Sequence, residues 1–525
     1  MNTVLLNSVP DSTIIPVLDV KKVIDRYGYN EETQNIFNRE NLLPAGVLNR
    51  LHSTYSQYTR KWVADDLIFT GKERYEGLKG FREIVDFLLL NGIEIGFIEE
   101  RELFIEVYRF LATKHILNTI DWKNFEYDSL FQLVFPQPGM INAETVNSYV
   151  SAKNEAERMA IVEDYIKKTN PHDGKQKLNK PWFVNDFGDK EFIDGSQHKY
   201  PQCQLIFDKT TQNCFAFCTY CFRHAQVRGD QDMFVQTDIG QIHDYLKRHT
   251  EITDVLITGG DAGFISYDRL EQYVTPIIED PALFHIKTLR LGSRALTFFP
   301  GLILSGSYKR MLGLFEKLTL NGIQIVWMAH FSTPREVLNP GTIAAIRRLK
   351  AHGVIIKSQS PMMNHISLFT DENGEVDIDR SAQNWIDLGN ILAMLSVGFH
   401  SIYCARPTGE HHYFTAPLAD INKIFCKVYR SLASINRPSR YITMTSSAGK
   451  TSLLGTTQVG GETAFVLKFN ESRNMEWMDK VYLAKYDETT TVIEKLKPFD
   501  TDAYFYEKEL NQIESDLQMQ MDTND

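Results

Sequence analysis

Between residues 204 and 403 the chain repeats a short apolar run followed by an amphipathic segment. Runs of this length bounded by polar residues are typical of buried strands, and the segments between them are typical of helices that pack on one face. Alternating strands and helices imply a parallel sheet with right-handed crossovers. Six strands are predicted: Gln204–Phe207, Val255–Thr258, Thr288–Leu291, Gln324–Met328, Val354–Lys357 and His400–Tyr403.

The sequence predicts that the chain divides into four segments. Residues 1–195 form a mostly helical N-terminal domain, with one amphipathic helix expected over 143–168 and a polar linker at 170–175. Residues 196–440 hold the six strand and helix units, and such folds place their chemistry at the carboxyl ends of the strands. Residues 441–500 form a C-terminal segment. Residues 501–525 form an acidic, partly disordered tail with a helix over 507–518.

Composition narrows the class of protein. The chain has 525 residues, of which 43% are hydrophobic and 23% charged, as in an ordinary globular protein. Its net charge of -11 provides no overall attraction to nucleic acid or to an anionic membrane. The first residues lack a basic n-region and an apolar core, and runs such as Phe87–Leu90 are too short to span a bilayer. Six cysteines in so long a chain favour a reducing compartment, so a cytoplasmic location is expected.

Three of these cysteines lie in one stretch directly after the first predicted strand. Cys214, Cys218 and Cys221 have the spacing Cys-x3-Cys-x2-Cys. Three thiolates can bind three irons of a cubane cluster and leave the fourth iron open for another ligand. The alternatives are three buried free thiols, or a zinc site with a fourth ligand elsewhere. The other three cysteines form no second pair of the kind that structural zinc sites use: Cys203, Cys404 and Cys426.

This cysteine stretch closely resembles the signature of the radical SAM superfamily. The resemblance implies an α/β fold with a partial (β/α)6 barrel, a [4Fe-4S] cluster and S-adenosylmethionine (SAM) as cosubstrate. It places the aromatic Tyr220 against the adenine of SAM. It also makes Gly259, Gly260 and Asp261, at the end of the second predicted strand, the motif that contacts the methionyl amino group. Taken alone, these residues would be a core aromatic and an ordinary turn.

Further motifs between about His198 and Phe469 are similar to those of one family within that superfamily, the lysine 2,3-aminomutases. The matching elements are His198–Pro201 before the cysteines, Gly292–Arg294, His330-Phe331, Ser358–Ser360 and Ala448–Ser452.

The family resemblance assigns roles to individual residues. Lys450, on an expected small-residue loop, is the lysine that forms an imine with pyridoxal 5′-phosphate (PLP), although spacing alone would describe it as a solvated loop lysine. Arg223 grips the substrate α-carboxylate, a task that suits its planar fork of donors. Tyr200 lies against the pyridine ring, Lys199 helps to hold the phosphate, and Gln359 is a cofactor-binding residue. The alternatives for Tyr200 and Lys199 are a core aromatic and a surface lysine.

The chain also departs from this family. Lysine-specific members hold the substrate ε-ammonium with two aspartates, and the corresponding positions here are Ala405 and Thr443. A second ammonium would be buried there without its partners, which argues against free L-lysine as the substrate. Arg406 favours a side chain with a carboxylate or a neutral group instead. The family's C-terminal cysteine cluster is absent from the sequence, so an oligomer contact that depends on it is not expected.

The sequence thus predicts a radical SAM, PLP-dependent amino-acid 2,3-aminomutase. It would take an amino acid as its small-molecule substrate and need an electron donor such as flavodoxin or ferredoxin, and a homo-oligomer is possible. One alternative is a radical SAM enzyme of another reaction type without PLP, which the uncharged Ala405 and Thr443 motivate. A second is a non-catalytic interaction protein that binds a metal cluster.

Overall fold

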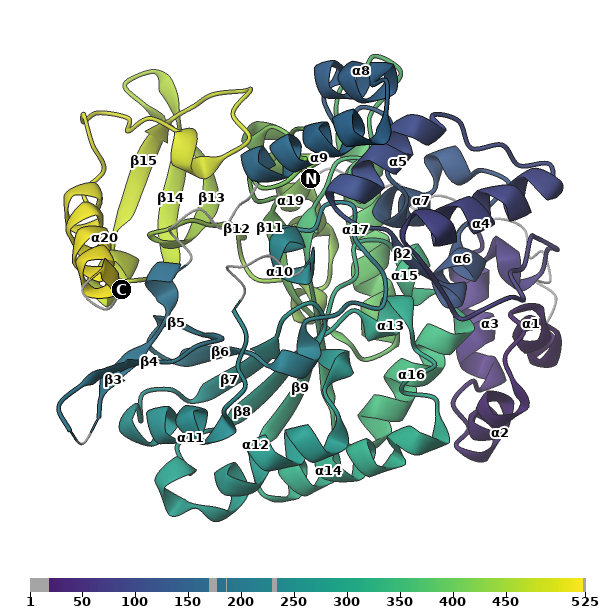
Figure 1. The fold of residues 1–525 in the computed structure, drawn as a ribbon, viewed down its shortest axis with the longest axis horizontal. Helices are drawn as coiled ribbons and strands as arrows, with labels where there is room; N and C mark the ends of the chain where they lie inside the picture. The colour runs from purple at the N-terminus through teal and green to yellow at the C-terminus, as the bar shows by residue number, and fades with distance from the viewer. Residues whose placement is uncertain (1–17, 170–176, 186, 229–233, 523–525) are drawn as a thin grey trace, which may run out of the picture.

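The computed structural model describes residues 18–169, 177–185, 187–228 and 234–522. Its main element is an 11-stranded sheet in the order β15-β14-β13-β12-β11-β10-β9-β8-β7-β6-β5 (Figure 1). Six neighbouring strands within it run parallel and confirm the six predicted ones. They are β6 (Cys203–Phe207), β7 (Asp254–Thr258), β8 (Thr288–Gly292), β9 (Gln324–Ala329), β10 (Ile355–Met362) and β11 (Gly398–Cys404).

Helices in the crossovers cover one face of this parallel part (Figure 1). Their starts follow from the sequence, because a short polar side chain accepts a hydrogen bond from a free N–H of the first turn. Asp238, Ser266 and Asp377 cap three of them in this way. The helices from β6 to β12 are α10 (His224–Arg228), α11 (Ile239–Arg248), α12 (Tyr267–Glu279), α13 (Ala295–Phe298), α14 (Lys309–Leu320), α15 (Pro334–Val337), α16 (Pro340–Ala351), α17 (Ile378–Met394), α18 (His411–Phe414) and α19 (Leu418–Ser431).

Alternation along the strands separates the helix-covered face from the barrel interior. In β10 the side chains of Ile356, Ser358 and Ser360 are buried, whereas Lys357 and Gln359 between them are half-buried. Successive side chains of a strand point to opposite faces, so the half-buried set lines the interior. The amine of Lys357 and the amide of Gln359 therefore reach the inside of the partial barrel.

The N-terminal region is helical, as predicted, and packs beside the barrel (Figure 1). The single helix expected over 143–168 is wrong, because residues 152–154 separate α8 from α9 and Asn154 caps the second helix at the N–H of Glu157. The elements of this region are α1 (Val20–Arg26), α2 (Glu31–Arg39), α3 (Ala45–Thr54), α4 (Gly77–Leu90), α5 (Ile98–Val107), α6 (Lys114–Thr119), α7 (Ser129–Val134), α8 (Ala143–Ser151), α9 (Glu155–Thr169) and the short hairpin β1 (Arg74–Glu76) and β2 (Leu111–Thr113).

The sheet continues beyond the six predicted strands on both sides. β5 (Ser196–Tyr200) pairs antiparallel with β6, and β12 (Ile442–Thr445) adds parallel to β11. An antiparallel extension follows with β13 (Gly449–Val459), β14 (Glu462–Ser472) and β15 (Val481–Lys485), and a separate hairpin joins β3 (Trp182–Val184) and β4 (Lys190–Phe192). The predicted helix over 507–518 is present as α20 (Glu507–Asp522). The linker predicted at 170–175 lies outside the described residues.

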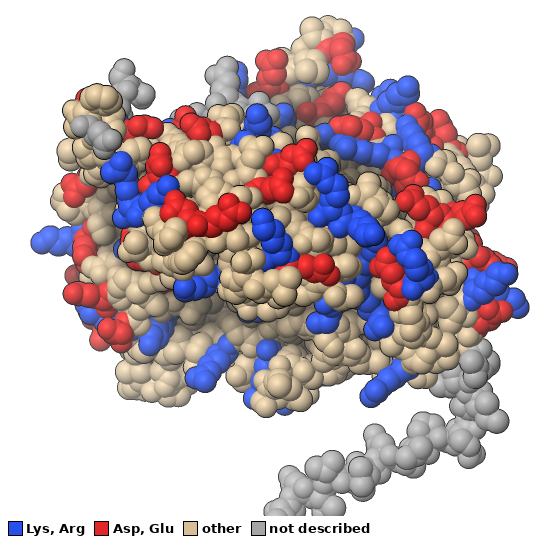
Figure 2. Space-filling model, turned by 90° about the horizontal axis from the view of Figure 1, so that it is seen from below, with Lys and Arg blue, Asp and Glu red and all other residues tan. Residues whose placement is uncertain are grey.

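Acidic and basic side chains are interspersed over the face shown in Figure 2, and neither sign forms a continuous field there. Within the described ranges no helix has the length and apolar character needed to cross a bilayer.

Candidate active site

The cysteine stretch follows β6 and lies against the N-terminal helical region. Phe217 and Thr219, inside the stretch, donate their backbone N–H groups to the carbonyls of Leu111 (2.8 Å) and Leu133 (2.9 Å). Buried backbone groups need such partners. The N-terminal region therefore fixes the course of the cysteine stretch, a relationship that no local sequence signal indicates.

The environment of the three thiols fits an iron–sulfur cluster. Burial raises the pKa of Cys214, Cys218 and Cys221, because a thiolate is poorly solvated there, and a charge on Cys218 or Cys221 would raise that of Cys214 further. Iron ions would supply the missing positive charge and bind the thiolates as soft ligands. Arg294 Nη1 lies 3.1 Å from Cys218 Sγ, and hydrogen bonds of this kind tune a cluster. The described residues contain no group of three or more His, Cys, Asp or Glu gathered around a single-ion site.

The glycines after β7 pack directly on the cysteine stretch. Gly260 donates its N–H to Thr211 O (2.8 Å), and a Cβ at Gly260 would lie 2.6 Å from Asn213 O and 2.9 Å from Cys214 Sγ. Gly259 has φ +147°, a conformation that favours glycine. The predicted motif therefore lies beside the cysteines because only glycine allows the two loops to approach so closely.

We expect Gly260→Ala to lower the rate of SAM cleavage by about 100-fold, because a displacement of Cys214 by a fraction of an ångström disturbs the cluster ligands. Iron content and 5′-deoxyadenosine release after anaerobic reconstitution measure this effect. Gly313→Ala is the matched control, since a Cβ at that exposed position on α14 meets nothing within 4 Å. Equal rates for the two variants would contradict the packing argument.

The carboxylate of Asp261, the third residue of the motif, forms hydrogen bonds within the protein that hold the loop in place. Its carboxylate accepts the N–H groups of Gly263 and Arg294, each at 2.8 Å. Burial nevertheless raises its pKa to about 6. Asp261 therefore links the segments that follow β7 and β8 through hydrogen bonds, next to the glycines.

Tyr220 belongs to a buried polar network that the sequence did not predict. Its hydroxyl receives a hydrogen bond from Arg294 Nη1 (2.9 Å) and lies 3.2 Å from His330 Nε2. Arg294 also forms a buried ion pair with Glu336, and burial holds the pKa of His330 well below its usual value. The sequence motifs Gly292–Arg294 and His330-Phe331 thus contribute Arg294 and His330 to this network, whereas no sequence motif contains Glu336.

Arg223 lies at the carboxyl end of β7. Its Nη1 donates to Thr258 Oγ1 (2.9 Å) and to Gly259 O (3.2 Å). These bonds use both hydrogens of one terminal nitrogen and leave Nε and Nη2 for a carboxylate. Burial lowers the pKa of Arg223 to about 10, with a further contribution from the charge of Arg406. The guanidinium remains charged at neutral pH.

The structure brings Lys199, Tyr200 and Lys450 together from β5 and β13. Lys450 Nζ lies 5.1 Å from the centre of the Tyr200 ring and pairs with Glu471 Oε2 at 2.6 Å. The expected loop is wrong for Lys450 itself, which is the second residue of β13 and pairs in register with Thr445 and Glu471 on either side. Residues 446–448 form the turn. Pairing of β13 with β14 places Lys450 inside the strand rather than in that turn.

The other predicted positions lie around this group. Gln359 on β10 accepts a hydrogen bond from Tyr403 on β11 (3.0 Å), so it lies in the barrel interior. Ala405 directly follows β11, and Thr443 on β12 pairs in register with Tyr403. Both are buried and uncharged. The structure therefore brings the two substituted positions to adjacent strands at one end of the barrel.

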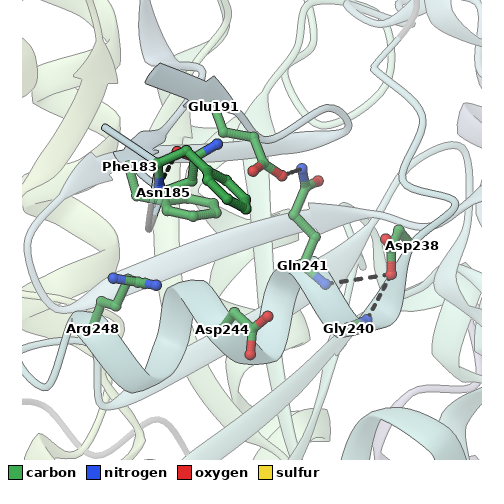
Figure 3. A pocket seen from close by; sticks show the side chains of 9 residues that line it. Phe183, Asn185, Glu191, Asp238, Gly240, Gln241, Asp244 and Arg248 are labelled. Atoms are coloured by element: carbon green, nitrogen blue, oxygen red, sulfur yellow. Dashed lines mark hydrogen bonds between the residues drawn. The ribbon is translucent and has the colours of Figure 1, made fainter. Parts of the chain in front are cut away.

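A surface pocket of about 380 Å³ lies elsewhere, between the β3–β4 hairpin and α11 (Figure 3). Glu191 accepts a hydrogen bond from Gln241 (2.8 Å), and Arg248 lies over the Phe183 ring (5.0 Å). Its lining includes none of the predicted site residues.

Comparisons with known proteins agree with the family resemblance. No family model matches the chain. A putative L-lysine 2,3-aminomutase of Aquifex aeolicus is 27% identical over 266 residues, which cover 50% of this chain and 65% of the relative. The L-lysine 2,3-aminomutase of Clostridium subterminale is 26% identical (40% and 51% covered), and the glutamate 2,3-aminomutase of Clostridioides difficile is 31% identical (32% and 37%). The chain spans less than two thirds of the length of each of these relatives.

Solved structures show weaker similarity. SuiB of Streptococcus suis bound to S-adenosylmethionine is 14% identical with a TM-score of 0.29 and covers 54% of both chains. A radical SAM methyltransferase from Sphaerobacter thermophilus is 12% identical with a TM-score of 0.31 and covers 69% of this chain and 93% of its own. Scores this low carry no argument about function.

The parallel six-stranded core, with its cysteine stretch after the first strand and its Gly-Gly-Asp turn after the second, defines a chain of the radical SAM class. Within that class, the chain is a divergent relative of the lysine 2,3-aminomutases.

Proposed function

We propose that this protein is a radical SAM, PLP-dependent amino-acid 2,3-aminomutase that moves an amino group from C2 to C3 of a substrate other than free L-lysine. The observation that carries the proposal is the convergence of Lys450, Tyr200 and Lys199, with Arg406 close enough for its charge to act on Lys199. The similarity to lysine and glutamate 2,3-aminomutases supports the reaction class.

The chain's own residues would bind and orient the reactants. When bound, the cluster and SAM supply a carbon radical by one-electron chemistry, and PLP supplies the conjugated ring that stabilises the substrate radical. Cys214, Cys218 and Cys221 would hold the cluster, and Tyr220 would lie against SAM. Arg223 offers Nε and Nη2 to the α-carboxylate, and Tyr200 offers its ring face to the pyridine.

The second candidate, a radical SAM enzyme without PLP, is favoured by one observation. Lys450 is paired with Glu471 and held in a strand, as a purely structural lysine would be. Anaerobic incubation with SAM, dithionite, PLP and a panel of amino acids separates the candidates. The proposed function predicts β-amino products that require PLP, whereas 5′-deoxyadenosine without any PLP-dependent product would support the second candidate. An electron donor such as flavodoxin or ferredoxin would replace dithionite in the cell.

Lys199 gives the site an expected pH dependence. Burial lowers its pKa to about 7, and the charges of Arg473, Arg406 and Lys450 act in the same direction. Because the folded-state pKa is lowered, Lys199 is mostly neutral above pH 7 and must take up a proton to bind a phosphate dianion. PLP affinity should therefore fall by up to about tenfold per pH unit above 7.

The pH dependence should be measured in a Lys450→Ala background, where covalent attachment does not contribute. In the Lys199→Met, Lys450→Ala double variant the slope should disappear. A slope that persists in the double variant would show that another group takes up the proton.

A further inference from the structure

Two arginines share one aromatic ring at the carboxyl end of the barrel. The guanidinium carbon of Arg406 lies 4.7 Å from the centre of the Phe222 ring, and that of Arg223 lies 5.1 Å from the same centre. The two guanidiniums are therefore no farther apart than the sum of these distances. Both side chains are half-buried, and they come from different parts of the chain, one after β6 and one after β11.

Neither arginine has an ion-pair partner in the part of the chain that the structure describes. Burial lowers the pKa of Arg406, and its guanidinium lies over the same Phe222 ring as that of Arg223. Glu494 is the carboxylate whose charge reaches Arg406, and it accepts a hydrogen bond from Ser447 N (3.4 Å). Holding two such cations together is costly unless a ligand brings negative charge.

The wider surroundings are cationic as well. Lys199 and Arg473 act on one another electrostatically and lie near Arg406, while Glu471 is already paired with Lys450. A phosphate and one α-carboxylate would balance part of this charge. A substrate with a further ammonium group would add to the repulsion, and Ala405 and Thr443 offer it no carboxylate. A substrate with a further carboxylate would reduce the repulsion.

We infer that Arg406 binds the side-chain carboxylate of the substrate while Arg223 binds its α-carboxylate, so that the substrate is a short dicarboxylic α-amino acid. The inference rests on the proposed function and adds the substrate class to it. Arginine suits both tasks, since its planar fork binds a carboxylate through two parallel hydrogen bonds. Stacking on Phe222 holds the Arg406 fork in place before the substrate arrives.

Binding should be measured with the full chain, reconstituted anaerobically with the cluster, SAM and PLP but without reductant. Equilibrium dialysis compares L-glutamate and L-aspartate with L-glutamine and L-lysine. We expect one of the two dicarboxylates to bind most tightly and Arg406→Gln to weaken it by about 30-fold or more, as for a buried charge pair that loses one partner. L-Glutamine should change by less than about tenfold, the value of an ordinary hydrogen bond.

Two further variants keep this test decisive. Arg406→Lys retains the charge and should recover part of the dicarboxylate affinity, which a folding defect would not allow. Arg437→Gln is the matched control, because Arg437 also stacks on an aromatic ring (Tyr429 of α19, 4.6 Å), donates to the carbonyl of Leu432 and should leave binding unchanged.

The outcomes of these binding measurements test the dicarboxylate substrate separately from the aminomutase reaction. Tighter binding of L-lysine or L-glutamine than of both dicarboxylates would overturn the inference. So would an Arg406→Gln variant that loses PLP affinity and keeps dicarboxylate affinity, because Arg406 would then belong to the phosphate. Arg406-dependent dicarboxylate binding with no β-amino product after dithionite is added would support the inference and remove the aminomutase reaction.

Discussion

Replacing Cys218 with serine is expected to lower SAM cleavage by more than about 100-fold, since even outer contacts of a metal site are worth 10- to 100-fold and Cys218 would be a direct ligand. Serine is a hard oxygen donor that is protonated at neutral pH, so it does not replace a soft thiolate on iron. The burial of the thiols, the position of Arg294 beside Cys218 and the packing of Gly260 against Cys214 all support a role of these cysteines as cluster ligands. The same loss is expected for Cys214→Ser and Cys221→Ser.

Iron content, the visible spectrum and release of 5′-deoxyadenosine after anaerobic reconstitution provide the measurements. The control is Cys426→Ser, because Cys426 is an exposed free cysteine on α19 and lies outside the cluster stretch. That variant should keep about four irons per chain. Full SAM cleavage by the Cys218→Ser protein would refute the assignment of the cluster and with it the radical mechanism.

Lys450→Ala is expected to abolish the absorption band of lysine-attached PLP and to lower β-amino product formation by more than about 100-fold, because the side chain that attaches the cofactor is gone. SAM cleavage should remain measurable, since Lys450 lies on β13 and the three cluster cysteines lie in the stretch after β6. This separation of the two activities distinguishes a PLP lysine from a residue that merely stabilises the fold.

Trapping with borohydride followed by peptide mapping identifies the modified lysine. Lys468→Ala is the matched control, because Lys468 lies on β14 of the same hairpin and is also half-buried. It should keep both the absorption band and the product. PLP trapped at an unchanged level in the Lys450→Ala protein would overturn the assignment of this residue.

Much of the order of strands and helices could be predicted, because it depends on the pattern of apolar and polar residues within short segments. The apolar runs that become β6 to β11 are each buried under crossover helices, so their hydrophobicity specifies strands directly. β13 to β15 were missed because their sequences mix polar and apolar positions, and their strands form through pairing with neighbours rather than through burial on both faces. The break between α8 and α9 was missed for a similar reason: an amphipathic pattern continues through it.

The sequence by itself determined the spacing of the three cysteines, the Gly-Gly-Asp motif and the absence of charge at Ala405 and Thr443, because order and residue type are sufficient for these. Only the tertiary structure decided which groups meet across long distances in the chain. It paired Arg294 with Glu336, placed carbonyls of the N-terminal region on the cysteine stretch, and brought Arg406 to the ring that Arg223 also contacts. Such contacts depend on the packing of separate elements, and no local pattern of residues encodes them.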